Sequence, residues 1–440
     1  MRPFTNPNAQ WRPAVLGQRI AVALFSLVLS TAAADWPQYR GPTHDGVCTE
    51  KILTQWPANG LRQIWKAPLT DGFSSFAVGQ GLAVTMVKRS VEGADREVCV
   101  ALDAQTGQER WAVPLGIAKY EKGGDTGTPA NNGGDGPRST PSIDGGRVYA
   151  TTAQLGLYCL DAASGRQIWS RDLVRQNGGQ NIGWENAASP LIDGDLLFVM
   201  GGGAGQALLG IDKHDGHVVW KGEDDPITHA TPVVVTLLGV RQVIFFTQKG
   251  LVGVERATGQ VLWRYRFPYS VSSAASPVVG GDIVYCSCGY GVGAGAARIS
   301  RIGNQFTATG LWRLPAKTLN SHWSTPVYKD GCLYGLFGFK KFGTCPFQCV
   351  ELATGRIVWS KDGFGPGGCV RVGDQVLVLG DAGELVLTQA TPRGYTELAR
   401  TKALTGKCWS TPAISNGHLY IRSTKEGVCL DISPGRVAHR

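Results

Sequence analysis

The chain has 440 residues, 43% of them apolar and 18% charged, so it can bury a large core. Its 60 glycines and 13 tryptophans favour many short strands with aromatic anchors over long charged helices. The formal charge of +9 is spread without basic runs, which argues against a nucleic-acid-binding surface.

The first 34 residues have the pattern of a secretory signal peptide. Three arginines form a basic region, residues 20–29 are apolar, and residues 32–34 are alanines that suit signal peptidase. The apolar run is too short to span a bilayer comfortably and no later segment does so, so we expect no transmembrane segment. Cleavage after Ala34 starts the mature chain at Asp35, without a cysteine to carry a lipid. These features predict a periplasmic or secreted protein.

One sequence element recurs along the rest of the chain: an acidic residue, a glycine four positions later and a tryptophan four positions after that. Its five clear copies are Asp103-Gly107-Trp111, Asp161-Gly165-Trp169, Asp212-Gly216-Trp220, Glu255-Gly259-Trp263 and Glu351-Gly355-Trp359. The acid can accept N–H groups of a turn, and glycine can take a positive φ there. A tryptophan between neighbouring sheets buries about 150–250 Å². We therefore predict that these residues dock adjacent blades of a propeller.

A Thr-Pro or Ser-Pro pair opens most repeats. The pairs are Thr140-Pro141, Ser189-Pro190, Thr231-Pro232, Ser276-Pro277, Thr325-Pro326 and Thr411-Pro412, spaced by 42 to 49 residues with one double gap. A degenerate unit at 368–400 fills that gap, and residues 73–111 form the first unit, which makes eight.

The eighth unit, residues 410–432, lacks an outer strand, and an orphan strand at 61–65 is of the missing kind. We predict an all-β, eight-bladed β-propeller over residues 61–432, whose ring is closed by the N-terminal strand. An N-terminal arm at 35–60 precedes the propeller, and a short tail at 433–440 follows it.

Eleven cysteines in an exported chain permit disulfides. Cys159, Cys349 and Cys429 align at one position of the repeat, which favours packed free thiols. Cys286 and Cys288 lie two apart on a strand, a poor geometry for a mutual disulfide, so we expect their partners elsewhere in the chain.

The segment Ala101-Leu102-Asp103-Ala104-Gln105-Thr106-Gly107, followed by Trp111, resembles the tryptophan-docking motif of the quinoprotein propeller family. The chain looks like exported bacterial PQQ-repeat proteins, both the polyvinyl-alcohol-dehydrogenase-like group and the BamB-like propellers of outer-membrane assembly. That resemblance implies one of two functions. One is a PQQ- and Ca²⁺-dependent alcohol dehydrogenase; the other is a protein-binding module without a cofactor. The chain lacks the adjacent cysteine pair of the dehydrogenases, and it has no Cys-x-x-Cys-His haem motif.

The residues just before the Thr/Ser-Pro pairs are unusually polar and aromatic, and equivalent positions in a propeller converge at one end of its channel. They are Arg138, Trp184, Glu185, Asn186, His229, His322, Trp323, Lys407 and Trp409. In one interpretation Glu185 and Asn186 bind Ca²⁺ while Arg138 or Lys407 approaches a quinone. In another the aromatic and histidine side chains line a sugar- or peptide-binding rim. In a third these residues only cap strands.

Two hypotheses of function follow. The first is a non-catalytic binding or assembly module that acts through its rim and central channel; the alternative is a PQQ- and Ca²⁺-dependent alcohol dehydrogenase. We expect a monomer that binds a protein, a saccharide or another small molecule. The insertion at 125–137 is acidic and amide-rich, but its spacing does not match an EF-hand, so we expect a loop.

Overall fold

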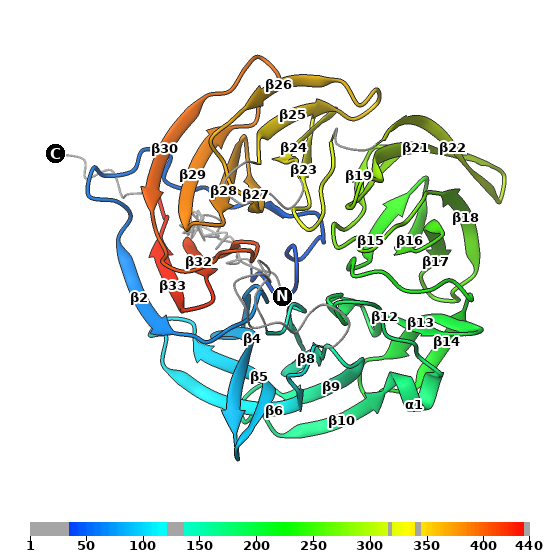
Figure 1. The fold of residues 1–440 in the computed structure, drawn as a ribbon, viewed down its shortest axis with the longest axis horizontal. Coiled ribbons are helices and arrows are strands. Elements are labelled where there is room, and N and C mark those ends of the chain that lie inside the picture. The colour runs from blue at the N-terminus through cyan, green and yellow to red at the C-terminus, as the bar shows by residue number, and fades with distance from the viewer. Residues whose placement is uncertain (1–34, 121–135, 316–318, 339–344, 435–440) are drawn as a thin grey trace, which may run out of the picture. The chain divides into compact units, whose positions relative to one another are not determined.

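The computed structural model describes residues 35–120, 136–315, 319–338 and 345–434. The predicted signal peptide, most of the insertion at 125–137 and most of the tail lie outside the described residues. Within them, eight sheets follow one another around a central axis (Figure 1). The predicted eight-bladed β-propeller is confirmed.

Each blade has four antiparallel strands, which are named below in order from the axis outwards. Blades 1 to 4 consist of β3 (Ala77–Gly79), β4 (Leu82–Val91), β5 (Ala94–Asp103) and β6 (Glu109–Ile117); β7 (Ser142–Asp144), β8 (Arg147–Thr151), β9 (Gly156–Asp161) and β10 (Gln167–Asp172); β11 (Leu191–Asp193), β12 (Leu196–Gly203), β13 (Gln206–Asp212) and β14 (Val218–Gly222); β15 (Val233–Leu237), β16 (Val240–Thr247), β17 (Gly250–Glu255) and β18 (Val261–Arg266). A five-residue helix, α1 (Leu173–Asn177), follows blade 2.

Blades 5 to 8 repeat the arrangement. They consist of β19 (Val278–Gly280), β20 (Ile283–Cys288), β21 (Gly293–Ile302) and β22 (Gln305–Leu314); β23 (Val327–Lys329), β24 (Cys332–Leu336), β25 (Phe347–Glu351) and β26 (Ile357–Lys361); β27 (Gly367–Val372), β28 (Gln375–Gly380), β29 (Glu384–Gln389) and β30 (Glu397–Lys402); β31 (Ala413–Ser415), β32 (His418–Arg422), β33 (Glu426–Asp431) and β2 (Gln63–Pro68). The two middle strands of each blade are covered on both faces, so they are almost continuously apolar and buried, as in β28. The outermost strands are much more exposed to solvent, as in β10.

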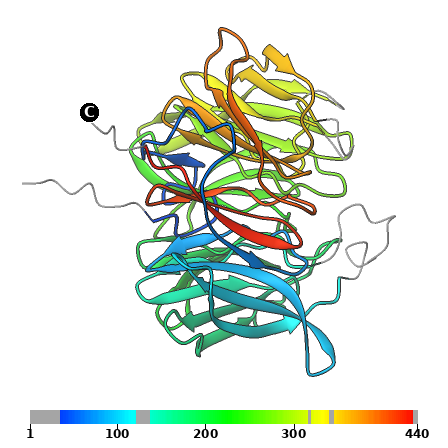
Figure 2. The same ribbon diagram turned by 90° about the vertical axis from the view of Figure 1, so that its left-hand side faces the viewer.

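The two ends of the propeller meet in blade 8. The strand β2 pairs with β33 in antiparallel register, with Trp65 opposite Cys429, and Figure 2 shows the blue N-terminal segment beside the red strands. The buried Arg422 joins blade 8 to blade 1, because its guanidinium donates to Thr85 Oγ1 and to the carbonyl of Met86 at 2.8 and 2.7 Å. Closure by the N-terminal strand is therefore as predicted.

The tryptophans of the repeat pack between blades. Trp111 Nε1 donates to the Ala162 carbonyl of the next blade at 2.8 Å, and Asp103 accepts the turn amides of Gln105 and Thr106. Gly165 has φ 74°, and a Cβ on it would lie 2.9 Å from the Trp111 ring, so the turn needs glycine. Trp169, Trp220 and Trp359 make the same bond to Lys213, Arg256 and Thr391.

Trp263 departs from this pattern. It is 3% exposed, but its Nε1 donates to Gln242 Oε1 of its own blade at 2.7 Å. The reason lies in blade 5, whose outer strands β21 and β22 run on to a hairpin at Gly303 in place of a docking turn. That turn would otherwise supply the carbonyl acceptor.

The Thr/Ser-Pro pairs join the blades at the axis. The hydroxyls of Thr140, Ser189, Thr231 and Thr325, and that of the equivalent Ser75, each accept the amide of the equivalent residue in the blade before: Ser75 N to Thr140, Thr140 N to Ser189, Ser189 N to Thr231, Ser276 N to Thr325, and Thr411 N to Ser75, all at 2.8–3.0 Å. In blade 7 this position is Gly368, where a Cβ would lie 2.8 Å from Thr411 Cα. The recurring hydroxyl therefore holds neighbouring innermost strands together.

The arm crosses the channel and bonds to the inner edges of several blades. Trp36 pairs with Val78 of blade 1, Pro37 accepts the Ile143 amide of blade 2, and Gln38 bonds to blade 3. Further on, β1 (Val47–Cys48) runs parallel to β27 of blade 7. The arm is thus part of the propeller core.

All eleven cysteines are buried and free. The packed thiols expected at 159, 349 and 429 are present as such. The expectation that Cys286 and Cys288 have disulfide partners elsewhere is wrong, because both side chains point into the apolar core between blades 4 and 5. There they act as small apolar residues.

Candidate functional site

The segments that precede the innermost strands form a ring of contacts at one end of the channel, which we call the mouth. Arg138 Nη1 donates to the Trp184 carbonyl at 3.2 Å, and His229 Nε2 lies 2.9 Å from the Gly183 carbonyl. The His229 amide donates to the Ser273 carbonyl, and the amides of residues 274 and 275 donate to the His322 carbonyl. The mouth therefore brings together blades 2 to 6.

The aromatic side chains complete the ring through blades 6, 8 and 1. Trp323 and Trp409 have ring centroids 4.5 Å apart, and Phe73 lies 5.0 Å from Trp409. Lys407 Nζ lies 4.9 Å from the Trp409 ring centroid, and His322 meets Trp323 edge-on at 5.0 Å. Lys407 thus makes a cation–π contact with a cluster of three aromatic rings.

Phe73 was missed by sequence reasoning. It precedes Ser75 by two residues, as Trp323 and Trp409 precede Thr325 and Thr411. Blade 1 has Ser75-Phe76 where the other repeats have Thr/Ser-Pro, so the missing proline hid the equivalence.

The opposite side of the mouth is polar and contains a second residue that sequence reasoning missed, Glu97. This fully buried carboxylate on β5 accepts the Tyr120 hydroxyl at 2.9 Å and the Ala153 amide at 2.8 Å. Burial raises the pKa of Glu97 to about 7, although Arg138 nearby acts in the other direction. Glu97 follows the charged residues Asp95 and Arg96 in β5, so nothing in the sequence marked it as a buried carboxylate.

Glu185, Asn186 and Trp184 form a tight, bonded turn. Trp184 and Glu185 have φ of 75° and 60°, which is strained for residues with side chains. Asn181 Nδ2 donates to Glu185 Oε2, and Asn186 Oδ1 accepts the Ala188 amide at 3.1 Å. Glu185 Oε2 and Asn186 Oδ1 therefore already accept hydrogen bonds from the protein itself.

His229 is neutral at ordinary pH. It is 3% exposed, and burial lowers its pKa to about 4. Its Nδ1 lies 3.0 Å from Ser272 Oγ, so both ring nitrogens have partners. A histidine held in this way positions the turn at Gly183 and has no free nitrogen for a metal.

The residues of the mouth do not fit PQQ and Ca²⁺. The Asn186 oxygen has a backbone donor, and its amide nitrogen donates to the Thr152 carbonyl at 3.2 Å, so neither atom points at a common cation position. Trp323 and Trp409 stack on each other at 4.5 Å, which leaves no room for a third planar ring between them. No step of catalysis through a quinone can be built on these side chains.

A small cluster of two aspartates and one histidine lies outside the mouth. Asp212, Asp215 and His217 could approach one ion on the docking turn of blade 3, but Asp212 accepts the His214 amide, and Asp215 accepts the His217 amide. Asp215 and His217 are exposed, and the hydrogen bonds of the two aspartates stabilise the turn. In the described part of the chain no helix has the length and apolarity needed to cross a bilayer.

The fold and the mouth together define the class: an eight-bladed propeller with tryptophan-docked blades, whose polar and aromatic side chains converge at one channel end. The family model described as outer membrane protein assembly factor BamB matches residues 94–334. The chain belongs to that family.

Individual relatives agree with this assignment. The outer membrane protein assembly factor BamB of Burkholderia pseudomallei (strain K96243) is 26% identical over 264 residues, which cover 51% of this chain and 63% of the relative. Among solved structures, BamB from Moraxella catarrhalis has a TM-score of 0.56 at 16% identity and covers 86% of this chain and 99% of its own. The quinohemoprotein alcohol dehydrogenase ADHIIG from Pseudomonas putida HK5 has a TM-score of 0.62 at 12% identity, with 92% and 82% covered. The two structures show the fold alone.

Proposed function

We propose that this protein is an exported, non-catalytic assembly module that binds an extended segment of another protein at its mouth. The observation that carries the proposal is the platform of Phe73, Trp409 and Trp323 beside Lys407, together with membership of an outer-membrane assembly family. Half-buried aromatic side chains supply contact energy at little entropic cost, and peptide side chains pack well on them. The family name and the predicted signal peptide support a role in the periplasm, at the outer membrane.

The alternative, a PQQ- and Ca²⁺-dependent alcohol dehydrogenase, has only the shared fold in its favour. Among the described residues of the mouth, the Asn186 oxygen already accepts a backbone amide, and Trp323 and Trp409 stack on each other. Fold likeness by itself carries no activity.

One titration separates the two functions. The purified chain from residue 35 is titrated with an unfolded outer-membrane β-barrel polypeptide in low urea, and separately with PQQ and Ca²⁺ in the presence of a redox dye and alcohols. We expect saturable polypeptide binding that weakens at least tenfold in the double variant Trp323→Ala, Trp409→Ala. The control is Ile302→Ala, because that side chain is 85% exposed on the β21–β22 hairpin, away from the mouth.

Stoichiometric quinone uptake with dye-linked turnover contradicts the proposal. So does polypeptide binding that survives the double variant unchanged.

A further inference from the structure

A small pocket lies between the arm and the innermost strands of blades 4 to 7. Its volume is about 150 Å³, and its lining includes Arg40 and Asp45 of the arm with Val279, Tyr328 and Arg371 of the strands. None of the residues that form the mouth lines it. It is therefore a separate site.

The arm itself shows what the inner strand edges recognise. The middle residue of an innermost strand turns its N–H and C=O towards the axis, where Val78 exchanges two backbone hydrogen bonds with Trp36, both 2.8 Å. In blade 3, Ile192 is bonded in the same way by a side-chain amide: its N–H donates to Gln38 Oε1 at 2.9 Å, and Gln38 Nε2 donates to its carbonyl at 3.2 Å. The axis-facing edge of an innermost strand therefore binds an amide group, from either a backbone or a side chain.

Blades 5 and 6 offer the same edge to the pocket. Val279 pairs with Val284, and Tyr328 with Leu333, in the register that Val78 has with Ala83. In the described residues no arm hydrogen bond reaches Val279 or Tyr328. Ile414 of blade 8 also has none, but it is buried and does not line the pocket.

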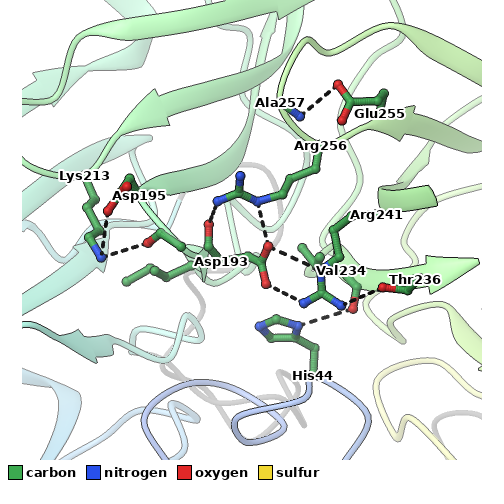
Figure 3. Close-up of polar contacts among 12 residues, drawn as sticks. His44, Asp193, Asp195, Lys213, Val234, Thr236, Arg241, Glu255, Arg256 and Ala257 are labelled. Carbon is green, nitrogen blue, oxygen red and sulfur yellow. Dashed lines mark hydrogen bonds and ion pairs between the residues drawn. The ribbon is translucent and has the colours of Figure 1, made fainter. Parts of the chain in front are cut away.

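The arm skips these two blades because it turns back on itself. The Gly46 amide donates to the Arg40 carbonyl at 2.9 Å, and Arg40 and His44 have positive φ of 63° and 62°. Within this turn, His44 Nδ1 lies 3.5 Å from the Val234 carbonyl of blade 4. Figure 3 shows His44 and Val234 facing each other. The Arg371 amide of blade 7 donates to the Gly46 carbonyl. A strained loop that leaves two strand edges unpaired is typical of a binding site.

The charges around the pocket favour an anionic group. Arg40 is 2% exposed and donates to the carbonyls of Thr325 and Pro326, and its Nε, like that of Arg371, has no hydrogen-bond partner among the described residues. The acid in the lining, Asp45, has its Oδ1 engaged by the Val47 amide at 3.0 Å. In the part of the chain that the structure describes, neither guanidinium group is in a close ion pair with a carboxylate, although Asp45 lies near Arg40.

We propose that this pocket binds the carboxyl-terminal end of an extended peptide. The last residues add to the free edge of β19 by backbone hydrogen bonds with Val279, as Trp36 does with Val78. The terminal carboxylate then lies against the guanidinium groups of Arg371 and Arg40. The arm closes the pocket on one side, so a chain end fits and a continuous chain does not.

The test uses an acetylated hexapeptide of alternating alanine and valine, with a free or an amidated carboxyl terminus. Binding to the purified chain from residue 35 is measured by calorimetry, and amide hydrogen exchange is followed at Val279 and Tyr328. We expect the free peptide to slow exchange of the Val279 amide more than that of Tyr328, and to bind at least tenfold more tightly than the amidated peptide.

Two substitutions locate the site. Val279→Pro removes only an N–H that faces the pocket, since the β19–β20 bonds are made by its neighbours, and proline is tolerated at such an edge. We expect Val279→Pro and Arg371→Gln each to weaken binding at least tenfold, whereas the control Val279→Ala keeps it. Equal affinity for both peptides, or full binding by a folded Val279→Pro protein, overturns the proposal. The Trp323→Ala, Trp409→Ala variant binds the hexapeptide normally, so failure here is distinct from failure of the mouth.

Discussion

Trp323 and Trp409 stack at 4.5 Å although they come from blades 6 and 8. The position equivalent to theirs in blade 7 is Pro366, within the run Gly365-Pro366-Gly367-Gly368, which carries no large side chain. The Gly-rich start of the degenerate blade thus lets the two indoles meet across it. The aromatic platform of the mouth thus depends on the absence of a large side chain at this position of blade 7.

Scaffold and mouth tryptophans should differ in their effect on stability. We expect Trp111→Ala to cost about 3–5 kcal/mol of unfolding free energy, because a ring that is 8% exposed and an interblade hydrogen bond are lost. Trp323→Ala removes one half-buried ring of the stacked pair and should cost only about 1 kcal/mol. Paired urea unfolding curves measure both. A mouth variant that is more destabilised than Trp111→Ala would refute this separation.

Arg422 should be the residue on which ring closure depends most. It is 1% exposed and donates to carbonyls of Thr70, Gly72 and Met86 in the segment of blade 1. Lysine cannot reproduce this fork, so Arg422→Lys should leave buried carbonyls unpaired and cost about 3 kcal/mol or more. The readout is the urea midpoint, with the exposed Arg175→Lys as the matched control. An unchanged midpoint would show that β2 alone holds the ring closed.

Glu97 should make stability fall with rising pH. Burial raises its pKa to about 7 from the ordinary value of 4.5, so the folded protein holds this proton more tightly than the unfolded chain. The contribution is present below pH 4.5 and lost as pH rises through 7, by about 3 kcal/mol at most. Glu97→Gln should flatten the curve of unfolding free energy over this range. Identical pH profiles for the two proteins would contradict the assignment.

The thiols should be unreactive in the folded protein. All eleven are buried, and burial raises the pKa of Cys369 and Cys408 to about 12. A disulfide-exchange dye should therefore label no thiol in native buffer and eleven in guanidinium. Reductant should leave the melting temperature unchanged. Fewer than eleven labelled thiols in guanidinium would reveal a disulfide.

Most of the fold could be predicted from the repeat, because the docking turns and the Thr/Ser-Pro pairs can be recognised by their residue types and spacing. Trp111 could be placed between blades from its spacing alone. Phe73 and Glu97 could not be placed, since one lacks the proline signal and the other depends on which strands cover it. The path of the arm could not be predicted either. Gln38 and His44 bond to backbone groups at strand edges, and every residue carries such groups, so the sequence does not mark the partners.

The arm has a consequence for the order in which the molecule acquires its structure. Glu50 accepts the amide of Asn416 across a sequence separation of 366 residues, and Val47 pairs with Arg371. Loops of that length close slowly, and the partners of the first-made segment are among the last to be synthesised. Until blade 8 has been synthesised, the leading segment and several strand edges therefore lack their partners and are exposed to chaperones and proteases. A truncation near the C-terminus removes the endpoint of folding as well as one blade.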